Sequence, residues 1–204
     1  MLKGYFETRF VQLGGQIISV QDFTPKSLGN LSLELKKADI VFLSAENPQE
    51  ALEAIGILRK AGFSSPIIGG DGFDSEDLWQ MHPEINNVFF TTHAYLGSDN
   101  PDPKVISFRK AYMKANSGSA PNAFSALGYD SANLIMTAIS KANSTDPDLV
   151  RKSLMTIRNF EGITGTISFS PSSRIPKKSV SIIKIDKGNR SLVKQILPAV
   201  VPAP

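Results

Sequence analysis

Three short segments place chemically capable side chains directly after apolar runs that have the length of strands: Ser44–Asn47, Gly69–Asp74 and Thr91–His93. In an open parallel sheet, ligands bind beyond the carboxyl ends of the strands. The second segment is the most informative, because three glycines around Asp71 let the backbone turn sharply and let a ligand approach closely. Its carboxylate can hold an ammonium group through charge-assisted hydrogen bonds. Spacing alone leaves a second interpretation equally open, in which Asp71 caps the next helix or stabilises a turn.

Other chemistries have weaker support in the sequence. Asp71 and Asp74 are close enough to share a metal, but the spacing of a calcium loop is absent. His82 and His93 are far apart, and neither sits in a metal-ligand motif. The chain contains no G-x-S-x-G, Walker A or G-x-G-x-x-G motif and no evident pairing of a nucleophile with a base. The residues therefore offer no catalytic pair for an enzyme, and neither a metal nor a cofactor is expected.

Composition and charge narrow the class of protein further. The chain has 204 residues and no cysteine, which excludes a disulfide scaffold and a thiolate metal site. Residues 1–100 carry 7 basic and 13 acidic side chains, whereas residues 101–204 carry 15 basic and 6 acidic ones. The basic residues of the second half are scattered and have no interleaved aromatic platform, which argues against nucleic-acid binding. A solvated, mixed surface would account for the asymmetry, but the hydrophobic periodicity favours two halves that belong to different lobes.

In the first half, the hydrophobic pattern alternates between the helical and the strand period. Helices are predicted at 2–13, 28–35, 48–61 and 75–81, and strands at 16–20, 39–44, 66–69 and 88–92. Asn47 followed by Pro48 is typical of a helix start. This order predicts a three-layer α/β fold around a parallel sheet with right-handed crossovers. Such units normally open with a strand, so we expect that a preceding strand is missing from this chain.

The pattern changes near residue 101. Helices are predicted around 105–112, 124–138 and 146–157, with no strand before Gly165–Phe169. Two further strands, Ser179–Ile185 and Ser191–Ile196, flank a turn at 186–189.

Three motifs carry a resemblance that covers nearly the whole chain: Ala61–Asp74, Pro121–Asp130 and Phe160–Phe169. They resemble, in order and spacing, the type I periplasmic binding proteins for branched-chain amino acids, the ligand-binding receptors of ABC importers. The resemblance implies two α/β lobes that are joined by three crossing strands and close on a ligand. Residues 1–93 and 166–204 would form the second lobe. Residues 94–165 would be a helical segment of the first lobe, whose sheet is absent from the chain. The apolar stripes of these helices would then remain uncovered and favour self-association.

The resemblance also implies roles for individual residues. Asp71, between Gly70 and Gly72, matches an acidic residue that holds the α-ammonium group of the ligand. Phe124 matches an aromatic residue that lines the ligand side chain. Glu46 stands where the family often has a tyrosine, which suggests the hypothesis that it meets a polar or cationic ligand side chain.

A set of partners and a location follow from the same resemblance. The ligand would be an amino acid or amide, and the full-length protein would deliver it to a membrane permease in the periplasm or outside the cytoplasm. The first residues carry no apolar signal core. The portion that holds the ligand carboxylate would precede residue 1, so this chain would be a truncated form with half a site. A ligand-sensing receptor or regulator domain of the same fold is the alternative.

Overall fold

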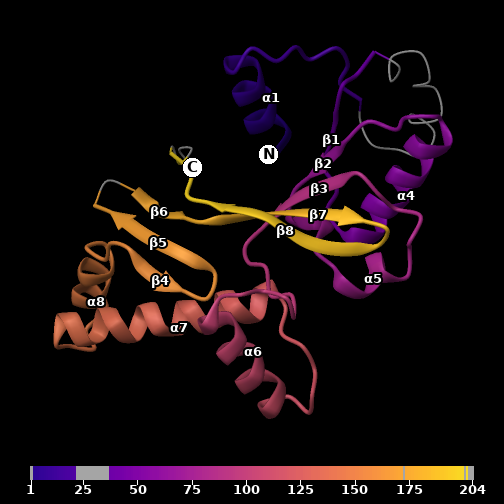
Figure 1. Cartoon of the computed structure of the whole chain (residues 1–204). Helices are drawn as coiled ribbons and strands as arrows, with labels where there is room; N and C mark the ends of the chain where they lie inside the picture. Colours follow the sequence, from indigo (N-terminus) through magenta and orange to yellow (C-terminus); the bar gives the residue numbers. More distant parts are fainter. Residues whose placement is uncertain (1, 22–36, 172, 200, 202–204) are drawn as a thin grey trace. The chain divides into compact units, whose positions relative to one another are not determined.

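The computed structural model describes residues 2–21, 37–171, 173–199 and 201, and it divides into two compact units. One unit comprises residues 1–91 and 183–191, and the other comprises residues 92–182 and 192–204. The boundary at 182/183 differs from the sequence-based boundary at 165/166, and the assignment of segments to lobes stays a prediction. Within the described ranges, the helices are too short or too polar to cross a membrane. Figure 1 gives the element labels used below.

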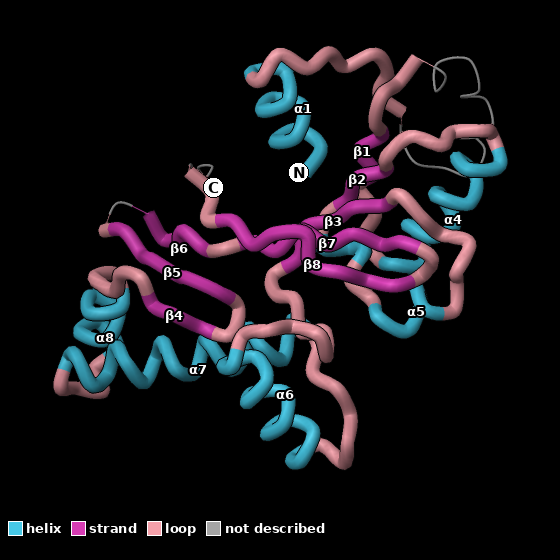
Figure 2. The backbone as a smooth tube through the Cα atoms, viewed as in Figure 1, coloured by secondary structure: helices cyan, strands magenta, loops and turns pink. Residues whose placement is uncertain are grey.

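The first unit follows the predicted alternation of helices and strands (Figure 2). Its elements are α1 (Leu2–Gln12), β1 (Val41–Leu43), α4 (Pro48–Lys60), β2 (Ile67–Gly69), the 3₁₀ turn η1 (Asp71–Phe73), α5 (Glu76–Gln80) and β3 (Val88–Thr92). The predicted strand at 16–20 is wrong, because that segment pairs with no strand in the described part of the chain. The predicted helix at 28–35 lies outside the described residues.

A five-stranded sheet has the order β1-β2-β3-β7-β8, where β7 is Val180–Asp186 and β8 is Asn189–Ile196. The pairs β1–β2 and β2–β3 are parallel, as the sequence predicts. Leu43 pairs with Gly69, and Gly69 pairs with Phe90. The carboxyl ends of three neighbouring strands therefore meet at one edge of the sheet, which is where ligands bind in this class of fold.

The core of the first unit is aromatic. Phe73, Trp79 and Phe90 are fully buried, and the ring of Phe73 lies 6.2 Å from each of the other two, centroid to centroid. The residues of α4 that face this core share helical spacing: Ala51, Ala54, Ile55 and Leu58. Because Phe73 belongs to η1, the turn that follows β2 is tied to the core.

The second unit combines three helices with a small antiparallel sheet. The helices are α6 (Pro103–Ala115), α7 (Ala123–Ala142) and α8 (Pro147–Leu154), as predicted. The sheet has the order β4-β5-β6, from Phe160–Gly162, Gly165–Ser170 and Ser173–Lys178. The expectation that no strand precedes Gly165 is wrong, because β4 pairs antiparallel with β5 across a tight turn. A strand of three residues is too short to show its period in the sequence.

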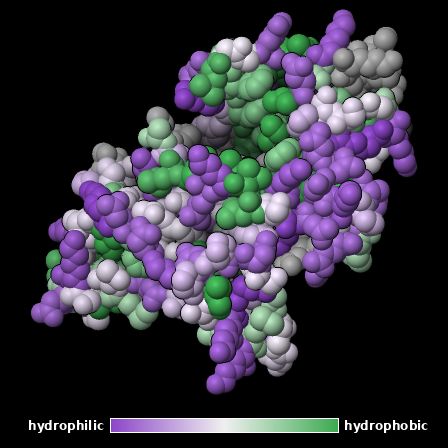
Figure 3. All heavy atoms as spheres, in the orientation of Figure 1, coloured by the Kyte–Doolittle hydropathy of each residue, from purple (hydrophilic) through white to green (hydrophobic). Residues whose placement is uncertain are grey.

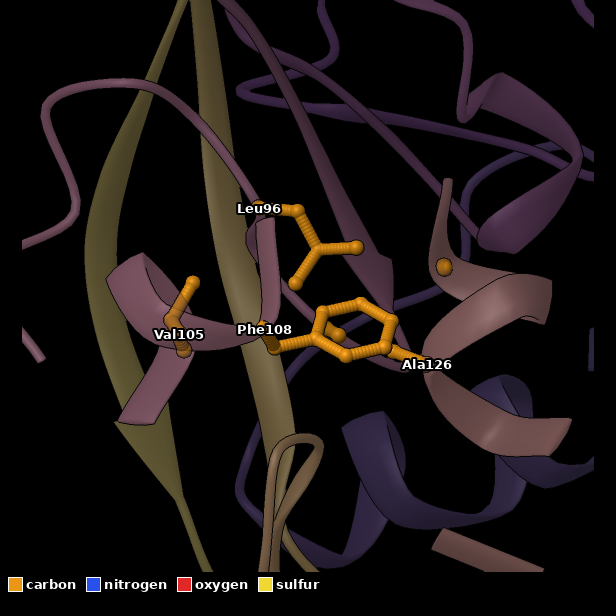
Figure 4. Close-up of a cluster of buried hydrophobic side chains, with 6 residues drawn as sticks. Leu96, Val105, Phe108 and Ala126 are labelled. Atoms are coloured by element: carbon orange, nitrogen blue, oxygen red, sulfur yellow. The ribbon is translucent and has the colours of Figure 1, made fainter. Parts of the chain in front are cut away.

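Two apolar clusters form the interior of the second unit. Leu96, Val105, Phe108 and Ala126 belong to the first, shown in Figure 4. Four residues from α7 and the segments after it form the other: Leu134, Ala138, Ile157 and Ile167. Helix α7 buries only part of its apolar surface. Exposed fractions of half or more remain on Phe124, Tyr129, Ile135 and Met136.

Candidate functional site

The loops that follow β1 and β2 are in direct contact. A Cβ atom on Gly72 would lie 2.2 Å from the carbonyl oxygen of Ala45, so this approach of two backbones requires glycine. The contact brings the turn that holds Asp71 against the loop that holds Glu46. Gly70 is buried and Gly72 is half-buried. Gly72 thus serves packing within the protein, and a role of either glycine in ligand binding stays a prediction.

A reciprocal cap fixes the backbone at Glu46. The side-chain oxygen of Asn47 accepts a hydrogen bond from the amide of Glu50 at 3.0 Å. The Glu50 carboxylate in turn accepts from the amide of Glu46 at 3.0 Å. The arrangement resembles a capping box, but the Glu50 carboxylate accepts from the residue before the N-cap, so it satisfies one amide in the first turn of α4 and one just before the helix. The Glu46 side chain itself is exposed.

Hydrogen bonds within the turn and from the buried core fix the backbone around Asp71. The amide of Phe73 donates to the carbonyl of Gly70 at 3.1 Å, and the amide of Asp74 donates to the carbonyl of Asp71 at 3.0 Å. The indole N–H of Trp79 donates to the carbonyl of Phe73 at 2.7 Å inside the core. With its neighbours anchored in this way, Asp71 lies exposed at the carboxyl edge of the parallel strands.

The acidic residue that follows in the turn has a structural role. The Asp74 carboxylate lies 2.6 Å from Nη1 of Arg190, and the two side chains are only 15% and 13% exposed. The described residues contain no group of three or more side chains that could hold a metal ion. Ser75, whose hydroxyl accepts from the amide of Leu78 at 3.3 Å, is the cap of α5. Asp71 therefore does not cap that helix.

Phe124 belongs to the second unit, whereas Asp71, Glu46, Gly70 and Gly72 belong to the first. It lies in the first turn of α7, where Asn122 accepts from the amide of Ser125 at 2.9 Å. The Phe124 side chain is 69% exposed.

Two charged residues of the second unit, Asp130 and Lys178, were not predicted from the sequence to be important. The Asp130 carboxylate is 2% exposed and accepts hydrogen bonds from the amides of Ile163 and Thr164, both at 2.8 Å. The Lys178 ammonium donates to the carbonyls of His93, Thr164 and Ser179 at 2.8, 3.1 and 3.0 Å. Asp130 is the last residue of the motif Pro121–Asp130, and no other feature of the sequence pointed to it.

Burial changes the chemistry of Lys178. Desolvation lowers the pKa of this ammonium to about 8, and the charge of Asp130 opposes that change. The three backbone carbonyls match its three N–H donors. No pattern in the sequence indicated this arrangement, because its partners lie up to 85 residues away.

A cavity of about 700 Å³ lies in the first unit beside α1. Figure 3 shows apolar residues gathered around this hollow. Phe6, Phe10 and Phe42 line it, and the rings of Phe6 and Phe42 stack at 4.1 Å. Asp71 and Glu46 are not among its lining residues, so the cavity does not contain the predicted site.

Comparison with known proteins identifies the class. Residues 12–190 match the profile of the periplasmic binding protein family, and the chain belongs to that family. No curated protein matches the chain. The leucine-binding protein LivK from Thermotoga maritima has a similar structure, with 27% sequence identity and a TM-score of 0.78 over 97% of this chain.

Two further structures share the fold. The branched-chain amino acid binding protein LivJ from Streptococcus pneumoniae, in complex with isoleucine, is 24% identical with a TM-score of 0.66 over 90% of this chain. An ABC transporter substrate-binding protein from Desulfitobacterium hafniense, in complex with leucine, is 21% identical with a TM-score of 0.73 over 94%. This chain spans 56%, 50% and 56% of the length of the LivK, LivJ and D. hafniense structures.

Proposed function

We propose that this chain belongs to the substrate-binding component of an ABC-type amino-acid importer and supplies the residue that holds the α-ammonium group of the ligand. The observation that carries the proposal is the placement of Asp71, exposed on an anchored turn at the carboxyl edge of parallel strands. Membership of the periplasmic binding protein family and the similarity to a leucine-binding protein support it.

The proposed chemistry is charge-assisted recognition. The Asp71 carboxylate accepts hydrogen bonds from the ligand ammonium, and the anchored turn holds it in place before the ligand arrives. In this proposal Phe124 packs against the ligand side chain, and Glu46 meets its polar or cationic end. These three roles rest on the resemblance of the motifs to the family.

The remaining ligand contacts are proposed to lie in the portion of the fold that this chain does not span. The chain corresponds to 56% of the length of the leucine-binding structure. Half of a ligand site loses donors for the carboxylate and excludes water poorly. We therefore expect the 204-residue chain to bind amino acids weakly.

The proposed function also implies a location and partners. The component works outside the cytoplasm and delivers its ligand to a membrane permease. Association of two copies of the chain stays a prediction. It would bury apolar side chains that α7 leaves exposed to water: Phe124, Tyr129, Ile135 and Met136.

The test is a nitrogen-15 NMR titration of the chain with L-leucine, L-glutamine and L-arginine at millimolar concentrations. Amide signals of Gly70, Asp71 and Gly72 should shift and saturate for at least one of them. Asp71→Asn should abolish the response, because the neutral side chain cannot balance the ammonium charge. Asp77→Asn, at an exposed position of α5, is the matched control and should bind like the wild type.

The same titration tests Glu46. Glu46→Ala should reduce the response to L-arginine or L-glutamine and leave that to L-leucine intact. Saturable binding that survives Asp71→Asn would contradict the proposed function, and unaltered arginine and glutamine binding in Glu46→Ala would contradict the role of Glu46.

A further inference from the structure

The residue directly after β3, His93, has no role in the proposed function. His93 follows the last residue of that strand, so it stands at the carboxyl end of a parallel strand. Its ring is half-buried and lies 6.5 Å from the ring of Phe124, centroid to centroid, with 59° between the two planes. Tilted rings at this separation are a favourable aromatic arrangement.

Hydrogen bonds hold the backbone segments that carry both rings. The carbonyl of His93 accepts a hydrogen bond from the Lys178 ammonium at 2.8 Å. The same ammonium also donates to the carbonyls of Thr164 and Ser179, which fixes it in turn. Phe124 lies in a capped first turn of α7, between the buried side chains of Ala123 and Ala126. The backbone at both positions is therefore fixed, which reduces the ordering cost of binding.

We propose that His93 is a further ligand-contacting residue, and that its imidazole and the ring of Phe124 form one wall that packs against the ligand side chain. This inference rests on the proposed function. The exposed ring of Phe124 gains most from an apolar contact that removes it from water. The wall therefore suits an amino acid with an aliphatic side chain, such as leucine.

The experiment compares L-leucine with glycine, which has the same ammonium and carboxylate but no side chain. Affinities are measured by NMR titration of the 204-residue chain. His93→Ala should weaken leucine binding roughly fivefold to tenfold, the range expected for one aromatic contact, and should leave glycine binding unchanged. His93→Phe should keep the affinity for leucine, because the ring supplies the contact. His82→Ala is the matched control, since it removes the other histidine, which lies in the first unit.

A direct readout does not require substitution of His93. The sequence contains two histidines, so each imidazole C–H signal can be assigned with His82→Ala. Leucine should shift the His93 signal and not the His82 signal. A His93 signal that stays fixed during saturable leucine binding overturns the inference. Equal loss of leucine and glycine binding in His93→Ala, or a His93→Phe variant as weak as His93→Ala, also overturns it.

The failure of the proposed function has a different signature. Asp71→Asn should weaken both leucine and glycine, because both carry the ammonium group. If this variant binds both ligands as the wild type does, the proposed function fails and the inference fails with it. If Asp71→Asn weakens both and His93→Ala changes neither, only the inference fails.

Discussion

The Asp130 carboxylate accepts two hydrogen bonds from Thr164, one from the amide at 2.8 Å and one from the hydroxyl at 2.7 Å. The two residues are 34 positions apart in sequence. Asp130 lies in α7, and Thr164 lies in the turn between β4 and β5. Their contact therefore joins the second recognised motif to the third and ties the longest helix of this unit to its sheet. Both side chains are buried, so the bonds are shielded from competing water.

The first prediction concerns that contact. Asp130→Asn replaces one oxygen by an NH₂ group, which cannot accept and would face an N–H or O–H donor. We expect the free energy of unfolding to fall by about 3 kcal/mol, the range for losing charged hydrogen bonds and burying unpaired donors. Urea denaturation measures the loss. Asp148→Asn, at a side chain that is 80% exposed, is the control and should change stability by less than about 0.5 kcal/mol. Equal effects of the two substitutions would contradict a structural role for Asp130.

The second prediction concerns the glycine beneath Asp130. A Cβ atom on Gly162 would lie 2.4 Å from Oδ2 of Asp130, whose carboxylate is fixed by its hydrogen bonds. We expect Gly162→Ala to destabilise the protein by about 2 kcal/mol, as overpacking does. Gly128→Ala is the matched control, because it lies inside α7 and its Cβ would meet no atom within 4 Å apart from the backbone of its own helix. That substitution should stabilise by about 1 kcal/mol through helix propensity. A stable Gly162→Ala variant in urea denaturation would show that the carboxylate can move.

Local signals explain which parts of the fold could be predicted. Asn47 and Pro48 specify the start of α4 through contacts within one turn, and the apolar run before Ser44 specifies β1. The segment at 16–20 has the composition of a strand, but a strand forms only with a partner, and composition contains no information about the partner. The short strand β4 was missed for the opposite reason, because its pairing with β5 compensates for a weak local pattern.

The same contrast applies to the candidate site. The position of Asp71 at the edge of the sheet follows from the parallel order of strands, which the alternation of elements predicts. The anchor of its turn does not, because Asp74 and Arg190 are 116 residues apart. Lys178 likewise reaches a carbonyl 85 residues away. Contacts of this range depend on tertiary structure, and a single sequence does not reveal them.

The third prediction concerns the ion pair below Asp71. Arg190→Met leaves the mostly buried carboxylate of Asp74 without its cationic partner at 2.6 Å. We expect a loss of about 3 kcal/mol in the free energy of unfolding, typical of removing one partner of a buried pair. The amide signal of Asp71 should shift as well, because the turn loses an anchor.

A control variant and a double-mutant cycle accompany this measurement. Lys184→Met breaks a pair with Asp186 that is 3.5 Å long and about half exposed, and it should cost less than about 0.5 kcal/mol. The double variant Asp74→Ala/Arg190→Met should lose less than the sum of the single losses. Additive losses would show that the two residues stabilise the turn independently.

The fourth prediction concerns the pH dependence contributed by Lys178. Burial lowers the pKa of this side chain from its ordinary 10.5 to about 8 in the folded protein. Between these two pH values the unfolded chain binds more protons than the folded one, so the contribution of Lys178 to the free energy of unfolding rises with pH. Lys178→Met removes three hydrogen bonds and should cost about 2 kcal/mol at neutral pH.

That cost should grow as the pH rises from 8 to 10.5, because only the wild type gains stability from the release of this proton. Urea denaturation of the wild type and Lys178→Met at each pH measures the difference, and other titrating groups cancel in the comparison. A difference that stays constant or shrinks over this range would mean that the three carbonyls hold the ammonium charged more strongly than burial disfavours it. In that case Lys178 would be a permanently charged link between the segment after β3 and the end of β6.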